Sequence, residues 1–243
     1  MNQKCDLHIH SNFSDGRYSI PQIVDIFGKL GFNAIAITDH ICEKKSILGQ
    51  VAHRMSYSLT QSTFSLYMKT LKDEGHRALE QYGMLLIPGY EITKNSLNNT
   101  RSAHLLVLGT EEYISPDLSV DQVLLAARAL NAFTIAAHPF YTGDFEFQTY
   151  ELWSRKEELA SQIDAWEVNH RKTICPEILT SGLPLIASSD FHHLKHLSSW
   201  KTKVYSELTM PSIFQGIRQQ NLDFFYDQQD VEFSSQKLGL GLQ

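Results

Sequence analysis

The sequence predicts an α/β fold, a β/α barrel of the TIM type that is incomplete or distorted. Short apolar, β-branched segments alternate with amphipathic helical segments about seven times along the chain, as β–α repeats do. Most of the apolar segments are continuous, which is typical of parallel strands buried on both faces. A length of 243 residues suits one such domain. A doubly wound open sheet is the alternative.

The individual elements follow from apolar runs and helix signals. The expected strands cover residues 5–10, 34–40, 85–93, 104–109, 133–139, 163–169, 184–192 and 201–208. A helix is expected over residues 21–30, since Ser19 and Pro21 are start signals and Gly31 is a stop signal. A second helix places these apolar residues on one face: Val120, Val123, Leu124, Ala127 and Leu130.

One segment interrupts this rhythm, and it follows the second strand. Residues 43–83 are about twice as long as an ordinary β–α connection and are rich in Ser, Lys, Gln and Tyr. Their second half looks helical, with Tyr67, Leu71 and Leu79 among charged residues. The segment is either an extended crossover helix or a lid over a site. We expect a single domain over residues 1–243 that contains this insertion.

Composition narrows the class of protein. The net charge of −6 argues against a protein that coats long nucleic acids. No apolar run approaches the roughly 20 residues that cross a bilayer, and MNQKC leads directly into the first strand without room for a signal peptide. Cys5, Cys42 and Cys175 form neither a CxxC motif nor a disulfide framework. We therefore expect a cytoplasmic protein.

Histidines and carboxylates lie at or near the end of almost every expected strand. In the first strand His8 and His10 share one face, because alternate side chains point the same way. The other such residues are Asp15, Asp39, His40, Glu91, His104, His138, Asp190 and His192. Active sites of β/α barrels form where the C-terminal strand ends converge. His104 begins its strand, so that strand has to start late or run differently.

Each of these residues also has an ordinary explanation. A lone histidine is more often a hydrogen-bonded structural residue than a ligand, and Asp15 in SDG is a good turn residue. Glu91 and Asp190 are harder to explain, because a carboxylate that ends an apolar strand needs a partner. The joint placement favours a metal site, since the ordinary explanations would have to hold at nearly every strand end together.

The order of these motifs resembles the PHP family, the polymerase and histidinol phosphatase phosphoesterases. The matching elements are HxH, TDH, an apolar strand ending in GxE, a lone H, HP and SDxH, and they span residues 8–192. The chain looks most like the small, free-standing bacterial members. The resemblance implies a distorted (β/α)7 barrel that holds two to three divalent metal ions.

The resemblance also implies how the ligands are divided among the ions. His8, His10, Glu91 and Asp190 would hold one ion, Glu91, His104 and His138 a second, and Asp15, His40 and His192 a third. Some relatives have His where this chain has Asp15, a change that bears on metal preference. Mixed imidazole and carboxylate ligands suit Zn, Mn or Fe better than Mg.

The expected chemistry is hydrolysis of a phosphate ester. Three divalent ions bring more positive charge than three carboxylates return, so the pocket would attract phosphate. A metal-bound water whose pKa falls towards about 7 would supply the attacking hydroxide. The substrate would be a small phosphate ester or a nucleotide, with long nucleic acid disfavoured by the acidic balance, and the oligomeric state is not indicated.

Further residues are candidates for roles around the metals. Asp39 is expected to orient a ligand histidine, with turn capping as the alternative. Arg171 follows the sixth strand and is expected to bind the substrate phosphate and act in catalysis. Arg101 and Arg17 are further phosphate-binding candidates that also suit a solvated surface. Three histidines near the rim are candidates to protonate the leaving group: His170, His193 and His196.

Two other functions use a similar site. A metal-dependent amidohydrolase acts on C–N bonds and typically has a bridging modified lysine or glutamate, whereas no lysine ends a strand here. A non-catalytic, metal-stabilised module would be favoured by lost ligands, and every family ligand position carries a suitable residue.

Overall fold

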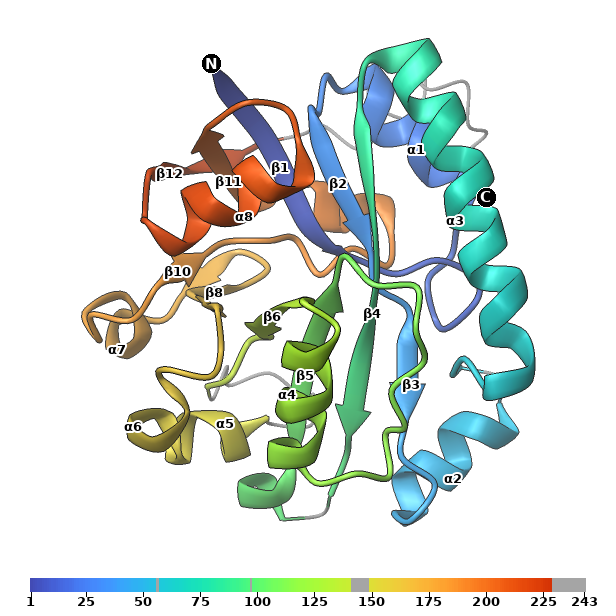
Figure 1. Cartoon of the computed structure of the whole chain (residues 1–243), viewed down its shortest axis with the longest axis vertical. Coiled ribbons are helices and arrows are strands. Elements are labelled where there is room, and N and C mark those ends of the chain that lie inside the picture. The colour runs from blue at the N-terminus through green and yellow to red at the C-terminus, as the bar shows by residue number, and fades with distance from the viewer. Residues whose placement is uncertain (56, 97, 141–148, 229–243) are drawn as a thin grey trace.

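The apolar segments form one continuous, barrel-like sheet (Figure 1). The structure is a computed structural model that describes residues 1–55, 57–96, 98–140 and 149–228. In sheet order its strands are β10 (Leu185–Ile186), β7 (Ala165–Glu167), β6 (Phe133–Ala136), β5 (Ala103–Leu108), β4 (Leu85–Lys94), β2 (Ala34–Ile37), β1 (Asn2–Ile9), β11 (Ser199–Tyr205) and β12 (Leu222–Asp227). β3 (His40–Cys42) pairs with β4 beside this path. A separate hairpin consists of β8 (Asn169–His170) and β9 (Thr173–Ile174). The expected domain of residues 1–243 extends past the described residues at its C-terminal end.

The segment that follows β10 closes the barrel by contacting β1 and β11, near the other end of the sheet. Phe191 forms a parallel bridge with Ile9 of β1, and the His10 N–H donates to the Phe191 carbonyl at 2.8 Å. On the β11 side, the Thr202 hydroxyl accepts from the Ala187 N–H and donates to the Ala187 carbonyl, both at 2.8 Å. The wall is therefore closed partly by side-chain bonds. This confirms the distorted α/β barrel rather than the open sheet.

Strand direction differs from the expected parallel barrel. β5 runs antiparallel to both β4 and β6, and β11 runs antiparallel to β1 and β12. A continuous apolar run reports burial on both faces, and antiparallel neighbours provide that burial here. The reversal places His104, at the start of β5, opposite Thr93 near the end of β4. His104 therefore lies at the same rim as the other strand-end residues.

Helices cover the outside of the sheet (Figure 1). They are α1 (Ile20–Lys29), α2 (Ile47–Arg54), α3 (Gln61–Tyr82), α4 (Val120–Ala129), α5 (Tyr150–Ser154), α6 (Lys156–Leu159), α7 (Pro176–Leu179) and α8 (Met210–Arg218), with the short 3₁₀ helices η1 (Asn99–Arg101) and η2 (Leu194–Leu197). α1 begins where the Gln22 side chain accepts from the Ser19 N–H at 2.9 Å. α4 buries the expected face of Val120, Val123, Leu124 and Ala127. None of the helices in the described part of the chain is both long and apolar enough to cross a membrane.

The core has two apolar clusters. One joins strand residues such as Ala36, Leu106 and Ile135 to Ile213 and Phe214 of α8. The other, larger cluster packs the sheet against α1, α3 and α4. Burial of these clusters is the main favourable term that holds the strand ends in fixed positions.

The long insertion contains the crossover helix. The expected strand 34–40 is split into β2 and β3, and residues 43–83 include α2 and α3. α3 packs against β4 and α1 and buries Tyr67 and Leu71, while Leu79 is 57% exposed. The buried Tyr67 hydroxyl lies 2.9 Å from the Ile37 carbonyl and 2.8 Å from the Gly89 carbonyl. One side chain thus fastens α3 to the end of β2 and the middle of β4.

We expect Tyr67→Phe to lower the free energy of unfolding by about 1–3 kcal/mol, because the Ile37 and Gly89 carbonyls lose the one hydroxyl proton that they share and the Asp39 N–H loses an acceptor. Tyr90→Phe is the matched control, since the Tyr90 hydroxyl donates to the Glu112 carbonyl at 2.8 Å. That loss should cost about 0.5–1.5 kcal/mol. Urea unfolding followed by circular dichroism measures both values. A cost for Tyr67→Phe no larger than that for Tyr90→Phe would contradict the anchoring role.

Candidate metal centre

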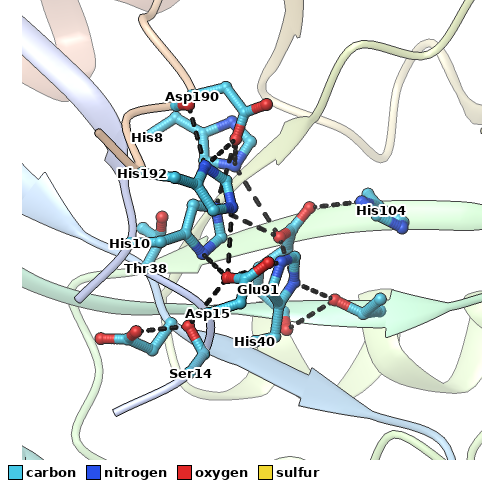
Figure 2. Close-up of polar contacts among 12 residues, drawn as sticks. His8, His10, Ser14, Asp15, Thr38, His40, Glu91, His104, Asp190 and His192 are labelled. Carbon is cyan, nitrogen blue, oxygen red and sulfur yellow. Dashed lines mark hydrogen bonds and ion pairs between the residues drawn. The ribbon is translucent and has the colours of Figure 1, made fainter. Parts of the chain in front are cut away.

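The strand-end histidines and carboxylates meet in one cluster at the rim of the barrel (Figure 2), buried at His8, His10, Glu91 and Asp190 and exposed at Asp15. They come from β1 (His8), the segment after β1 (His10 and Asp15), β3 (His40), β4 (Glu91), β5 (His104), the loop after β6 (His138) and the segment after β10 (Asp190 and His192). The structure therefore brings together every residue that the sequence suggests as a metal ligand.

Glu91 lies at the centre of this cluster. Its Oε2 is 2.7 Å from His40 Nδ1, 3.6 Å from His10 Nε2 and 3.7 Å from His8 Nε2. Its Oε1 is 2.8 Å from His104 Nδ1. Burial alone would raise the pKa of this carboxyl group, but His104 and His40 hold the pKa of Glu91 well below its usual value. Glu91 is therefore a carboxylate shared among several imidazoles.

Asp190 forms a second junction. Its Oδ1 is 3.4 Å from His10 Nε2 and 3.5 Å from His8 Nε2. The backbone at Asp190 has a φ of 49°, and that at His138 a φ of 28°. Such left-handed conformations are uncommon for residues other than glycine and are found at functional sites. The surrounding fold thus holds two ligand-type residues in an unfavourable local backbone geometry.

Asp15 joins a third part of the cluster. Its Oδ1 is 3.1 Å from His192 Nε2 and 3.5 Å from His40 Nε2. The His10 ring contacts the rings of both His40 and His192, with centroids 4.3 and 4.2 Å away. Burial and the neighbouring His192 and His40 lower the pKa of His10 to about 3. Burial would also lower the pKa of His40, but Glu91 and Asp15 raise it to about 9.

The donor atoms fit divalent cations. Atoms within 4.8 Å of one another form three groups: His10, Asp15, His40 and His192; His8, Glu91 and His138; and His8, His10 and Asp190. In the described part of the chain, His8 Nε2, both His10 ring nitrogens and both Glu91 oxygens are buried without a hydrogen bond of good geometry. Buried polar atoms that converge in this way need a partner, and a metal ion is the partner that imidazole and carboxylate share.

These three groups agree in part with the division that the family resemblance implies. His10 contributes to the group around Asp15 as well as to the group around Asp190. His8, rather than His104, lies with Glu91 and His138. His104 instead directs its Nδ1 at Glu91 Oε1, while its Nε2 is 3.0 Å from Asn95 Oδ1.

Glu167, the last residue of β7, is missing from the predicted set although it holds two of its members. Glu167 Oε1 is 3.0 Å from His8 Nδ1, and Oε2 accepts from the His138 backbone N–H at 2.9 Å. A proton held on Nδ1 leaves His8 Nε2 with its lone pair directed at the cluster. The signal in the sequence is the same as for Glu91: a carboxylate inside an apolar strand, here AWEV.

The Asp39 side chain holds the loop that carries Asp15, and its hydrogen bonds within the described residues go to serines. Its Oδ1 accepts from the Ser11 N–H at 2.9 Å and the Ser14 hydroxyl at 2.5 Å, and its Oδ2 accepts from the Ser11 hydroxyl at 2.6 Å. A Cβ on Gly16 would overlap the His10 carbonyl, so the turn packs directly on β1. These bonds match the turn-capping alternative for Asp39, and Ser11 and Ser14 share the task of positioning the loop.

Arg171 lies at the edge of the cluster, as expected. Its Nη2 is 3.5 Å from Asp190 Oδ2. Together with Lys195 and His196 it lines a cavity of about 560 Å³ that opens onto the cluster. Tyr57, between α2 and α3, also lines this cavity, so the first half of the insertion lies beside the site. Lys195 is a cationic cavity residue that the sequence does not single out.

The other two arginines lie elsewhere. Arg17 Nη1 is 3.2 Å from His193 Nε2 in an exposed contact, and Arg101 lines a separate cavity beside Glu43 and Lys45. Neither side chain lines the cavity over the cluster, so their expected phosphate-binding role is not supported. Burial and Arg171 lower the pKa of His196 to about 3. His196 is therefore a poor proton donor near neutral pH.

Comparisons with known proteins agree with this geometry. The model of the PHP domain matches residues 6–138, which is more than half of the chain. The DNA polymerase/3′-5′ exonuclease PolX of Bacillus subtilis is 26% identical over 212 residues, covering 83% of this chain but 36% of that protein. The chain thus spans about a third of the length of that relative.

A solved structure shows the same fold. It is a two-domain protein from Bacteroides vulgatus that contains a predicted PHP-like metal-dependent phosphoesterase. The TM-score is 0.66 at 22% identity, covering 93% of this chain and 65% of that one. Asp190 and His192 lie beyond the segment that the family model matches, and the fold alone places them in the cluster.

We expect Glu167→Gln to weaken binding of Mn²⁺ or Zn²⁺ by about tenfold or more, because second partners of metal-binding histidines typically matter by that factor. The amide keeps a single acceptor oxygen for the two N–H groups that Glu167 serves. Glu157→Gln, at a side chain 91% exposed, is the control. Isothermal titration of chelator-treated protein with each metal measures the affinity. Unchanged affinity in a folded Glu167→Gln variant would refute the orienting role.

Proposed function

Because the chain belongs to the PHP domain family, we propose that it is a metal-dependent phosphoesterase that hydrolyses a phosphate ester of a small molecule or nucleotide. The observation that carries this proposal is the convergence of imidazole and carboxylate groups around Glu91, with a guanidinium group at their edge. This arrangement combines a multi-cation site with a donor fork suited to phosphate.

The ligand sets follow the family pattern. His8, His10, Glu91 and Asp190 would hold one ion, Glu91, His104 and His138 the second, and Asp15, His40 and His192 the third. The mixed nitrogen and oxygen donors suit Zn²⁺, Mn²⁺ or Fe²⁺. Bound ions would supply Lewis acidity to the attacking water and positive charge to the phosphoryl oxygens.

Side chains in and around the cavity would bind the substrate and position the metal ligands. Arg171 is held against Asp190, so its guanidinium is pre-positioned at the place where a phosphoryl group would meet the cluster. Lys195 adds a second positive charge to the same cavity wall. Glu167 and Asp39 fix the histidines and the Asp15 loop, which limits reorganisation during the reaction.

Cavity size supports a small substrate. A volume of about 560 Å³ suits a small organic phosphate or a mononucleotide. The net charge of −6 gives no general attraction for long nucleic acid. The relative from Bacillus subtilis is a DNA polymerase/3′-5′ exonuclease, which makes nucleotides a substrate class to test first.

The decisive test measures metal content and phosphatase activity together. Protein purified without chelators should carry two to three ions per chain and hydrolyse p-nitrophenyl phosphate when Mn²⁺ or Zn²⁺ is added. Asp190→Ala should abolish turnover, whereas Asp73→Ala, at a side chain 61% exposed, should not change it. Metal without phosphatase activity would favour the amidohydrolase or the non-catalytic module. Absence of metal would refute the proposal.

Arg171→Ala should raise the KM for a phosphate monoester by about ten- to a hundredfold, because a charge-assisted hydrogen bond is lost. Arg101→Ala is the matched control, since Arg101 lines a different cavity, and should change KM by less than about twofold. Steady-state kinetics at saturating metal measure both variants. Equal effects of the two substitutions would remove Arg171 from the phosphate site.

A further inference from the structure

A second cavity lies on the other side of His138. It has a volume of about 240 Å³, and its apolar lining consists of Phe140, Ile174, Pro176 and Ile178. These residues follow β6 or belong to β9 and α7. His138 also lines the 560 Å³ cavity, so one imidazole of the metal cluster borders both spaces.

Two buried polar side chains that line this second cavity, Glu167 and Asn169, already have partners. Glu167 accepts from His8 and from the His138 backbone. Asn169 Nδ2 donates to the Arg171 and Ser188 carbonyls at 3.0 and 2.8 Å, and Asn169 Oδ1 accepts from the Ser188 N–H at 3.2 Å. A ligand would therefore be recognised here mainly by apolar contact, because few of these groups have bonding capacity left.

The position of the cavity relates it to the reaction. The His138 ring lies 5.7 Å from the His8 ring and 5.4 Å from the His170 ring, measured between centroids. His170 Nε2 is 3.7 Å from Asp190 Oδ2, and His170 also lines the second cavity. The apolar space therefore adjoins the metal cluster through His138 and His170.

We propose that this cavity, the apolar pocket (Phe140, Ile174, Pro176 and Ile178, bordered by His138 and His170), binds the alcohol part of the substrate. The preferred substrates would then be phosphate monoesters of compact apolar or aromatic alcohols. An apolar cavity of about 150 Å³ accommodates benzene, so the pocket has room for a substituted ring. This inference rests on the proposed phosphoesterase function.

Binding of two phosphonates to the metal-loaded protein tests the inference without catalysis. Benzylphosphonate and methylphosphonate carry the same anionic group and cannot be hydrolysed at an ester bond. Burial of a phenyl ring should make benzylphosphonate bind about tenfold tighter or more in isothermal titration. Equal affinities would overturn the apolar pocket and leave the phosphoesterase intact. If neither binds and p-nitrophenyl phosphate is not hydrolysed, both proposals fail.

A matched pair of substitutions locates the preference. Thr173 is exposed and lines the apolar pocket, while Thr180 is exposed at the end of α7 and does not line it. Thr173→Phe should fill the pocket and remove most of the benzyl preference while methylphosphonate affinity stays within about twofold. Thr180→Phe should change neither affinity. Equal loss for both phosphonates in Thr173→Phe, or the same loss in Thr180→Phe, would contradict the assignment.

A second variant guards against misfolding of the first. Ile174→Ala removes apolar surface from the pocket without adding bulk and should weaken benzylphosphonate binding several-fold, with methylphosphonate unaffected. Thermal unfolding shows whether each variant is folded. A folded Ile174→Ala protein that retains the full benzyl preference would place the ring elsewhere.

Discussion

The buried carboxylate of Glu91 is the constraint on which the rest of the molecule depends. A fully buried carboxylate is tolerated only if cations or hydrogen-bond donors surround it. Here the surrounding groups are His8, His10, His40 and His104, which come from three different strands. Two departures from a regular barrel serve this requirement. The short β3 pairs with the end of β4. β5 runs antiparallel to β4, so that His104 near its start lies beside Glu91.

Around this centre, further side chains position two of the imidazoles and the loop that carries Asp15. Glu167 holds His8, Asn95 holds His104, and the Asp39 carboxylate holds the Asp15 loop through two serines. Such supports determine which ring nitrogen faces the cluster and how far each group can move. They also explain why a barrel with strained backbone at Asp190 is maintained, since the surrounding contacts over-determine that conformation.

Much of the fold and the identity of the clustered residues could be predicted, because both depend on residue type and spacing. Apolar runs reveal buried strands, and polar residues at their ends reveal a site. Strand direction could not be predicted, because the run around His104 has the same pattern in either direction. Side-chain partners were equally inaccessible. Asp39 adjoins His40 in the sequence yet contacts serines, and Arg17 lies near Asp15 yet meets His193 at the surface. Glu167 was detectable by the rule applied to Glu91, but its partners depend on the tertiary fold.

The bridge between Ile9 and Phe191 has a consequence for biosynthesis. Asp190 and His192 flank Phe191, so the cluster straddles the seam where the first strand meets a segment made more than 180 residues later. A nascent chain that has emerged only as far as His138 contains most of the donor atoms but lacks the two that complete the seam. Contacts of such long sequence separation form late and slowly. The proposed metal site would therefore be complete only once residue 192 has left the ribosome, and a cation bound there would link the first strand to the segment that closes the barrel.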